Sequence, residues 1–191
     1  MKKVAVNDRE PVVLEENLQR RGLSEPLETS NLALNHYRIG PGEGFPGGIH
    51  THMDQEEVFI VIEGEAVFET LDGKVTISEG EAIRFAPGEF QSGKNESNTG
   101  LVVLAIGAPR NSEDMRIPVE CPECNHDNVR LDFNDEDGLR FVCPRCGTKQ
   151  TPQNCPECGD DDLRITLGDQ TQTIVVCQGC GTEFETPPLR E

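Results

Sequence analysis

The sequence is poor in aromatic residues and, over most of its length, in cysteine. It has no tryptophan and one tyrosine, and hydrophobic residues make up only 35% of its 191 positions. Little material is therefore available for a large apolar core, and any very small module must be stabilised by more than packing. The first 120 residues contain no cysteine, so thiolate chemistry is confined to the C-terminal part.

Positive charge is also scarce. Seventeen Lys and Arg residues stand against 35 Asp and Glu residues, for a formal net charge of −18. Such an excess of carboxylates repels nucleic-acid phosphates and anionic membranes, so we expect neither as a partner. The same balance is typical of proteins kept soluble in concentrated salt. We hypothesise a halophilic setting, which salt-independent stability would contradict.

Long apolar runs are missing. The N-terminal residues 1–6 lead into charged sequence without the apolar stretch of a secretion signal. No run approaches the roughly 20 residues of a membrane-spanning helix. We therefore expect a cytoplasmic protein, in which thiols stay reduced. In that setting eight cysteines arranged as CxxC pairs indicate metal binding.

Residues 1–112 have the pattern of an all-β domain. Short segments rich in apolar and β-branched residues alternate with Gly- and Pro-containing turns, which indicates an antiparallel barrel or sandwich. One short helix is predicted at 13–21, and a linker at 113–119. The predicted strands are 32–39, 57–62, 66–70, 74–77, 82–85 and 101–106.

A repeat with a period of 34 residues follows the linker. The two copies, residues 120–150 and 153–186, also share apolar positions, a Pro-Glu pair and a Gly-Thr pair, which indicates a duplicated unit. The first copy contains Cys121, Cys124, Cys143 and Cys146, and the second contains Cys155, Cys158, Cys177 and Cys180.

Each unit has two CxxC pairs separated by 18 residues. Four thiolates at this spacing form a tetrahedral Zn²⁺ site. Gly147, Gly159 and Gly181 directly follow CxxC pairs and suit the turns. Alternating residues around turns at 134–138 and 168–170 predict a β-hairpin in each unit.

The two units resemble zinc ribbons, which implies two Zn ions. Disulfides, rubredoxin-like iron and one site shared by Cys143, Cys146, Cys155 and Cys158 remain alternatives. We favour pairing within each repeat, because a duplicated unit should carry its own site. Acids outnumber bases in both units, so we expect protein contact or stabilisation in preference to nucleic-acid binding.

A second candidate metal site lies in residues 44–64, which read G-x5-H-x-H-x4-E-x6-G. His50 and His52, two apart on a strand, project from one face, and Glu57 begins the next strand. Two imidazoles and a carboxylate suit a first-row transition metal with open positions. Glu56 is an alternative to Glu57, and a plain polar lining of the barrel mouth is the alternative to a metal site.

This segment resembles the first motif of the cupin family, and residues 80–95 resemble the second. The family pattern places Pro at 86 and His at 91, where this sequence has Ala86 and Gln91. The resemblance implies a small antiparallel barrel, often a homodimer, that holds Mn, Fe, Ni or Zn. Its ligands would be His50, His52, Glu57 and Gln91. A Gln carbonyl is a weaker donor than imidazole, so we expect weak or partial metal binding.

Three functions fit these features, because the cupin fold hosts many chemistries. The first is a metal-binding cupin that takes a small ligand, with zinc ribbons for stability or protein contact. The second is a metal-dependent enzyme such as a dioxygenase or isomerase. The third is a ligand-sensing regulator linked to transcription. Tyr37, Ser92 and Lys94 are candidate polar groups near the barrel mouth, but their spacing assigns no general base.

Overall fold

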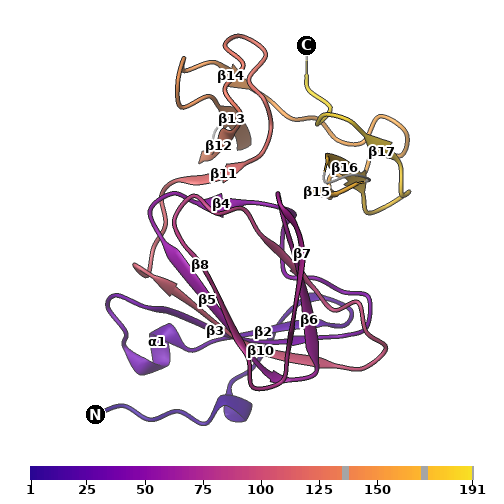
Figure 1. The fold of residues 1–191 in the computed structure, drawn as a ribbon. Coiled ribbons are helices and arrows are strands. Elements are labelled where there is room, and N and C mark those ends of the chain that lie inside the picture. The colour runs from indigo at the N-terminus through magenta and orange to yellow at the C-terminus, as the bar shows by residue number, and fades with distance from the viewer. Residues whose placement is uncertain (135–137, 169–171, 191) are drawn as a thin grey trace.

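The computed structural model describes residues 1–134, 138–168 and 172–190, and it is dominated by β-strands (Figure 1). The largest sheet has the order β1-β2-β3-β10-β5-β8, and a smaller one has the order β7-β6-β9. The first comprises β1 (Val12–Glu15), β2 (Leu18–Gly22), β3 (Ala33–Ile39), β10 (Leu101–Ala108), β5 (Glu56–Glu63) and β8 (Ala82–Phe85). The second comprises β7 (Gly73–Ser78), β6 (Glu65–Thr70) and β9 (Ser92–Lys94).

The two sheets enclose the first hydrophobic core, as expected for a barrel. Phe59 and Phe85 from the large sheet meet Phe68 from β6, with ring centroids 4.9–6.1 Å apart. Phe45 closes the group, with its ring centroid 5.2 Å from that of Phe59. Edge-to-face and tilted contacts of this kind stabilise a core beyond simple area burial. The few aromatic residues of the chain are thus concentrated where the two sheets face each other.

The six strands predicted from the sequence are present as β3, β5, β6, β7, β8 and β10. The helix predicted at 13–21 is wrong, because those residues form the hairpin of β1 and β2. β2 also pairs with β3, so long-range pairing and β-branched Val12 and Val13 outweigh the weak helical pattern. The helical segments of the described residues are α1 (Ser24–Leu27) and the 3-10 turn η1 (Val6–Asp8). No helix among them is long and apolar enough to cross a membrane.

The two C-terminal units lie together at the end of the barrel that carries β4 (Thr51–His52) (Figure 1). Each contains the predicted hairpin strands, although the expected turn residues 135–137 and 169–170 lie outside the described residues. The first unit has β12 (Val129–Asn134), β13 (Gly138–Val142) and β14 (Lys149–Gln150). The second has β15 (Leu163–Leu167), β16 (Thr173–Cys177) and β17 (Glu183–Phe184).

The first unit is joined to the barrel through one continuous sheet. Residues 113–119, predicted to be a linker, contain β11 (Met115–Ile117). β11 pairs with β12 on one side and with β4 on the other, where Met115 lies opposite His52 and Arg116 opposite Thr51. The barrel strand that carries His52 is therefore an edge strand of the first unit's sheet.

The second unit is joined to the barrel at the residue before His50. The Ile49 amide donates a hydrogen bond of 2.7 Å to the Ile165 carbonyl. A Cβ atom at Gly48 would lie 2.4 Å from the backbone N and O of Ile165, so only glycine permits this approach.

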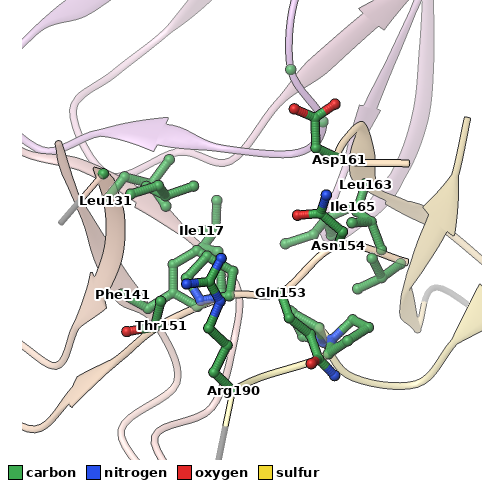
Figure 2. Close-up of a pocket in the computed structure, with 18 of the residues that line it drawn as sticks. Ile117, Leu131, Phe141, Thr151, Gln153, Asn154, Asp161, Leu163, Ile165 and Arg190 are labelled. Atoms are coloured by element: carbon green, nitrogen blue, oxygen red, sulfur yellow. The ribbon is translucent and has the colours of Figure 1, made fainter. Parts of the chain in front are cut away.

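A second hydrophobic core fills the junction of the three parts. It contains Ile49, Ile117, Val129, Phe141, Ile165 and Val175. Leu131 and Phe141 of the first unit and Leu163 and Ile165 of the second line a hollow of about 440 Å³. Figure 2 shows the two pairs on opposite sides of this hollow. The modules are thus packed together around Ile49 and are not loosely tethered.

A buried carboxylate also links the barrel to the second unit. Glu69 on β6 is 1% exposed. It accepts hydrogen bonds from Thr166 Oγ1 (2.6 Å), Lys94 Nζ (3.0 Å) and the Leu167 amide (3.3 Å). Burial alone would raise the pKa of Glu69, but the donors Thr166 and Lys94 outweigh it and hold the pKa below its ordinary value.

Replacing Glu69 with Ala should lower the free energy of unfolding by about 3 kcal/mol, since Lys94 would keep a partly buried charge without its carboxylate. Because the pKa of Glu69 is depressed in the folded state, its contribution is complete above the ordinary value of 4.5. The contribution disappears as pH falls through the folded-state pKa. Urea unfolding at pH 7 and pH 3 tests this, with Glu65→Ala, an exposed position on the same strand, as control. Equal losses in the two variants at pH 7 would contradict the buried linkage.

Candidate metal centres

The first candidate metal centre lies inside the barrel and takes its residues from two different sheets and the segment before β4. His50 precedes β4 and pairs with Gln91 through two backbone hydrogen bonds of 3.1 and 2.8 Å. His52 lies on β4 and projects toward the same side, so the two imidazole centroids are 5.2 Å apart. Glu57 comes from β5, and its Oε1 lies 3.8 Å from Nε2 of His52. One ligand atom from each of the three residues lies within 4.8 Å of the others.

Hydrogen bonds fix which imidazole nitrogen of His50 and His52 faces the centre. Nδ1 of His50 lies 2.9 Å from the Gly48 carbonyl, which can only accept, so Nδ1 carries the proton. Nδ1 of His52 lies 2.8 Å from Ser112 Oγ. The Ser112 hydroxyl donates its one proton to Asp54 Oδ1 at 2.6 Å, so it must accept from His52. Both Nε2 atoms are therefore left with free lone pairs, as metal ligation requires.

Charge at this centre also suits a cation. Burial lowers the pKa of His52, more than the nearby Glu57 raises it, so the ring is neutral at pH 7. Partial desolvation opposes ionisation of Asp54. Hydrogen bonds from Ser112 and from the Glu113 and Asp114 amides outweigh that effect and lower the pKa of Asp54. The ionised Asp54 thus holds Ser112, and Ser112 holds His52.

Gln91 occupies the position of the expected fourth ligand, and its amide nitrogen is engaged with Glu57. Nε2 of Gln91 donates a hydrogen bond of 2.9 Å to Glu57 Oε2. A flipped amide would set two acceptors against each other, so this orientation follows from the carboxylate. Gln91 is 3% exposed. It orients Glu57 and leaves Oε1, the oxygen nearest His52, free.

Glu56, the alternative ligand, points away from the centre. Its carboxylate pairs with Arg84 on β8 at 2.7 Å on the outside of the sheet, where both side chains are about half exposed. The alternation of side chains along β5 sends Glu57 inward and Glu56 outward. Glu57 is therefore the carboxylate that belongs to the cluster, as the spacing to Gly64 suggests.

The cluster opens into a cavity of about 390 Å³, here called the barrel cavity. Of the polar groups proposed for the mouth, Tyr37 lines it, whereas Lys94 is bound to Glu69. Burial raises the pKa of the Tyr37 phenol, which stays protonated. The sequence gives no signal for Ser112, Asp54, Gln55, Arg20 or Arg110, which also lie at this site.

Comparison with known proteins identifies the family of the barrel domain. The model of the cupin domain family matches residues 35–107, which include His50, His52, Glu57 and Gln91. Residues 35–107 form a cupin domain. A search of curated proteins gives no match.

Solved structures share the fold of this cupin domain. A sugar phosphate isomerase of the cupin superfamily from Silicibacter pomeroyi superposes with a TM-score of 0.56 at 18% identity, over 76% of this chain and 94% of that one. A polyketide cyclase from Streptomyces resistomycificus superposes with a TM-score of 0.54 at 20% identity, over 64% of this chain and 89% of that one. A predicted oxalate decarboxylase from Thermotoga maritima superposes with a TM-score of 0.50 at 23% identity, over 56% of this chain and 98% of that one. At these identities the similarity establishes the fold alone.

The cysteines form two further clusters beside the cupin domain, one in each unit. In the first, Cys121 and Cys146 have sulfurs 3.7 Å apart, and Cys124 and Cys143 have sulfurs 3.6 Å apart. In the second the corresponding separations are 3.7 and 3.5 Å. A tetrahedron with metal–sulfur bonds of about 2.3 Å has edges of about 3.8 Å. A disulfide would instead place two sulfur atoms about 2.05 Å apart. The structure groups the sulfurs within each repeat and forms no cluster of Cys143 and Cys146 with Cys155 and Cys158.

The backbone around the clusters has the tight turns that the glycines predict. Gly147, Gly159 and Gly181 have φ angles of 73–82°, and each donates its amide to the carbonyl of the first cysteine in its pair. At the remaining CxxC pair Asn125 takes the same conformation, with φ of 55°. Asn tolerates left-handed backbone better than most residues, so all four turns are alike.

Hydrogen bonds stabilise thiolate at one position of each cluster. The Thr148 hydroxyl lies 3.1 Å from Cys146 Sγ and lowers the pKa of that thiol to about 6. Thr182 does the same for Cys180. Desolvation and the neighbouring thiols raise the pKa of Cys124 to about 12. Four sulfurs this close cannot all ionise alone, and a divalent cation would remove that conflict.

Replacing Ser112 with Ala should weaken metal binding in the barrel by about tenfold to a hundredfold. The substitution removes the hydrogen-bond acceptor of His52 Nδ1, and the imidazole ring is then no longer held in its orientation. Titration with Mn²⁺, followed by the electron paramagnetic resonance of the free ion, measures the change. Ser78→Ala, an exposed serine on β7, serves as the control. Unchanged affinity in Ser112→Ala would show that the hydroxyl does not position His52.

Proposed function

We propose that the chain is a metal-binding cupin protein whose barrel holds one divalent transition metal and binds a small ligand beside it. The proposal is carried by the hydrogen bonds that leave Nε2 of His50, Nε2 of His52 and Oε1 of Glu57 free and close together. Three protein ligands leave open coordination positions, through which a bound metal would polarise or orient a ligand. Ser112 holds His52 in place and Gln91 orients Glu57, while the Gln91 carbonyl oxygen stays the predicted weak fourth donor.

We propose further that each four-cysteine cluster holds one Zn²⁺. Four sulfurs at tetrahedral spacing are the ligand set of structural zinc sites, which have no open position. The ions would hold each hairpin closed and keep β11 and Ile165 against the barrel. The small size of each unit supports this role, because each contributes only part of the second core and a unit of about 30 residues is too small to be stable by packing alone. The homodimer, the cytoplasmic location and the halophilic setting stay predictions.

Metal analysis tests both parts at once. The purified, reduced chain should contain two Zn per molecule and up to one further metal ion. The double variant His50→Ala/His52→Ala should lose the further ion and keep both Zn. Cys121→Ser/Cys146→Ser should lose one Zn, and Cys155→Ser/Cys180→Ser the other. Mass spectrometry of the metals after dialysis measures the content. Iron in place of zinc in the cysteine clusters, or no tightly held metal, would overturn the assignment.

A metal-dependent enzyme is the second candidate. The barrel cavity contacts the three ligands directly, and the Tyr37 hydroxyl and the Gln55 amide lie on its wall. Among the structures of similar fold, one is named as a sugar phosphate isomerase and one as a polyketide cyclase. Turnover of a candidate substrate that needs the barrel metal and is lost in His50→Ala would favour this function over ligand binding alone. Binding without turnover, with each metal tried, would exclude it.

A further inference from the structure

The barrel cavity is positively charged within a strongly acidic chain. Two guanidinium groups, those of Arg20 and Arg110, line it against the single carboxylate of Glu57. The chain as a whole has a net charge of −18. Carboxylates are therefore abundant, yet the cavity wall excludes all but the one that belongs to the metal cluster.

Arg20 reaches the cavity from β2. Its register partner on β3 is Tyr37, whose side chain lies in the barrel core and also lines the cavity. Alternation along β2 therefore turns Arg20 inward, while its neighbours Gln19 and Arg21 face the other way. Burial raises the pKa of the Tyr37 phenol, and the nearby positive charge of Arg20 opposes that rise. The guanidinium of Arg20 therefore lies beside the Tyr37 side chain on the cavity wall.

Arg110 reaches the cavity from the segment that follows β10. Its Nη1 donates a hydrogen bond of 2.8 Å to the Thr29 carbonyl, a residue 81 positions away in the chain. The preceding backbone is also held, because Gln55 Nε2 donates to the Pro109 carbonyl at 2.6 Å. Arg110 is thus positioned by neutral carbonyl groups and keeps its full charge available.

Neither arginine forms an ion pair with a carboxylate in residues 1–134, 138–168 or 172–190. Elsewhere the chain pairs arginines readily, as with Arg84 and Glu56, Arg116 and Asp114, and Arg164 and Asp162. A guanidinium presents a planar fork of donors that matches the oxygens of a carboxylate or phosphate group. Two such groups held in a cavity without protein counter-ions are arranged to receive an anion from outside.

We propose that the barrel cavity takes a small organic anion, one that carries a carboxylate or phosphate group recognised by Arg20 and Arg110. The rest of the ligand lies toward His50, His52 and Glu57, between the Asn35 and Gln55 amides and apolar residues such as Phe59 and Ile106. The volume of about 390 Å³ suits a molecule of small-metabolite size. The inference rests on the proposed ligand-binding function and names the class of ligand. A bound divalent metal would add to the positive charge.

Calorimetric titration of the metal-loaded protein tests the proposal. Inorganic phosphate and succinate are the two anionic probes, and erythritol is the neutral one, all at constant ionic strength. We expect both anions, or one of them, to bind while erythritol does not. The anion that binds more tightly shows whether the site prefers a phosphate or a carboxylate group. Arg20→Gln and Arg110→Gln should each weaken that binding by about tenfold or more. Arg38→Gln, an exposed arginine on β3, removes the same charge outside the cavity and should have little effect.

The variants also need a control for folding and for the metal site. Arg20→Lys and Arg110→Lys keep the charge and lose the planar fork, so they should bind the anion between wild type and the Gln variants. Metal content and thermal unfolding should match wild type in all five variants. Equal binding of erythritol and the anions, or equal weakening by Arg38→Gln, would overturn the proposal.

Failure of the proposed function would look different. A barrel that holds its metal but binds neither anion above erythritol contradicts the anion inference alone. A barrel that holds no metal, and binds phosphate or succinate equally well in His50→Ala/His52→Ala, contradicts the metal proposal and supports the role of Arg20 and Arg110.

Discussion

The short segment from Ile49 to His52 supplies backbone hydrogen bonds to three parts of the molecule. Ile49 pairs with the second four-cysteine unit, His50 pairs with Gln91 inside the barrel, and β4 pairs with β11 of the first unit. An extended segment at the end of a barrel would otherwise leave unpaired amide and carbonyl groups. Because each partner restricts the backbone on a different side, the imidazoles of His50 and His52 are fixed relative to Glu57. The cysteine units thus support the barrel site, and a metal in those units would act on it through β11 and Ile165.

Local compensation of charge explains how so acidic a chain builds buried polar sites. Glu69 is buried because Lys94, Thr166 and a backbone amide donate to it, and Glu57 is oriented by Gln91. The clustered thiols could hold a cation for the same reason, since several thiolates within 4 Å of one another repel each other unless a positive charge compensates them. The barrel cavity shows the opposite imbalance, with two arginines that no carboxylate neutralises among the residues described. Each site therefore indicates, by the charge it lacks, what kind of group it would bind.

The hairpin of β1 and β2 and the strand β11 show where local pattern misleads. Residues 13–21 match a short helix only weakly, and the pairing of β1 with β2 and of β2 with β3 decides for the hairpin. The polar segment 109–116 predicts the start of a linker, yet β11 forms there between two strands that the chain brings to either side of it. Ser112 and Asp54 lie 58 positions apart and meet only in the folded chain. Asn125 replaces the glycine of the other turns, and its tolerance of left-handed backbone makes it detectable in hindsight.

The grouping of the candidate metal-binding residues could be predicted from the sequence alone, because it depends on residue type and on spacing along one strand or one turn. The CxxC pairs bring their own sulfurs together, and His50 and His52 share a face whatever surrounds them. The tertiary structure alone decided the rest: which imidazole nitrogen is free, that Gln91 donates to Glu57, and that Arg20 and Arg110 meet in one cavity. Those features depend on hydrogen bonds and side-chain directions between segments far apart in the chain, on which local spacing has no influence.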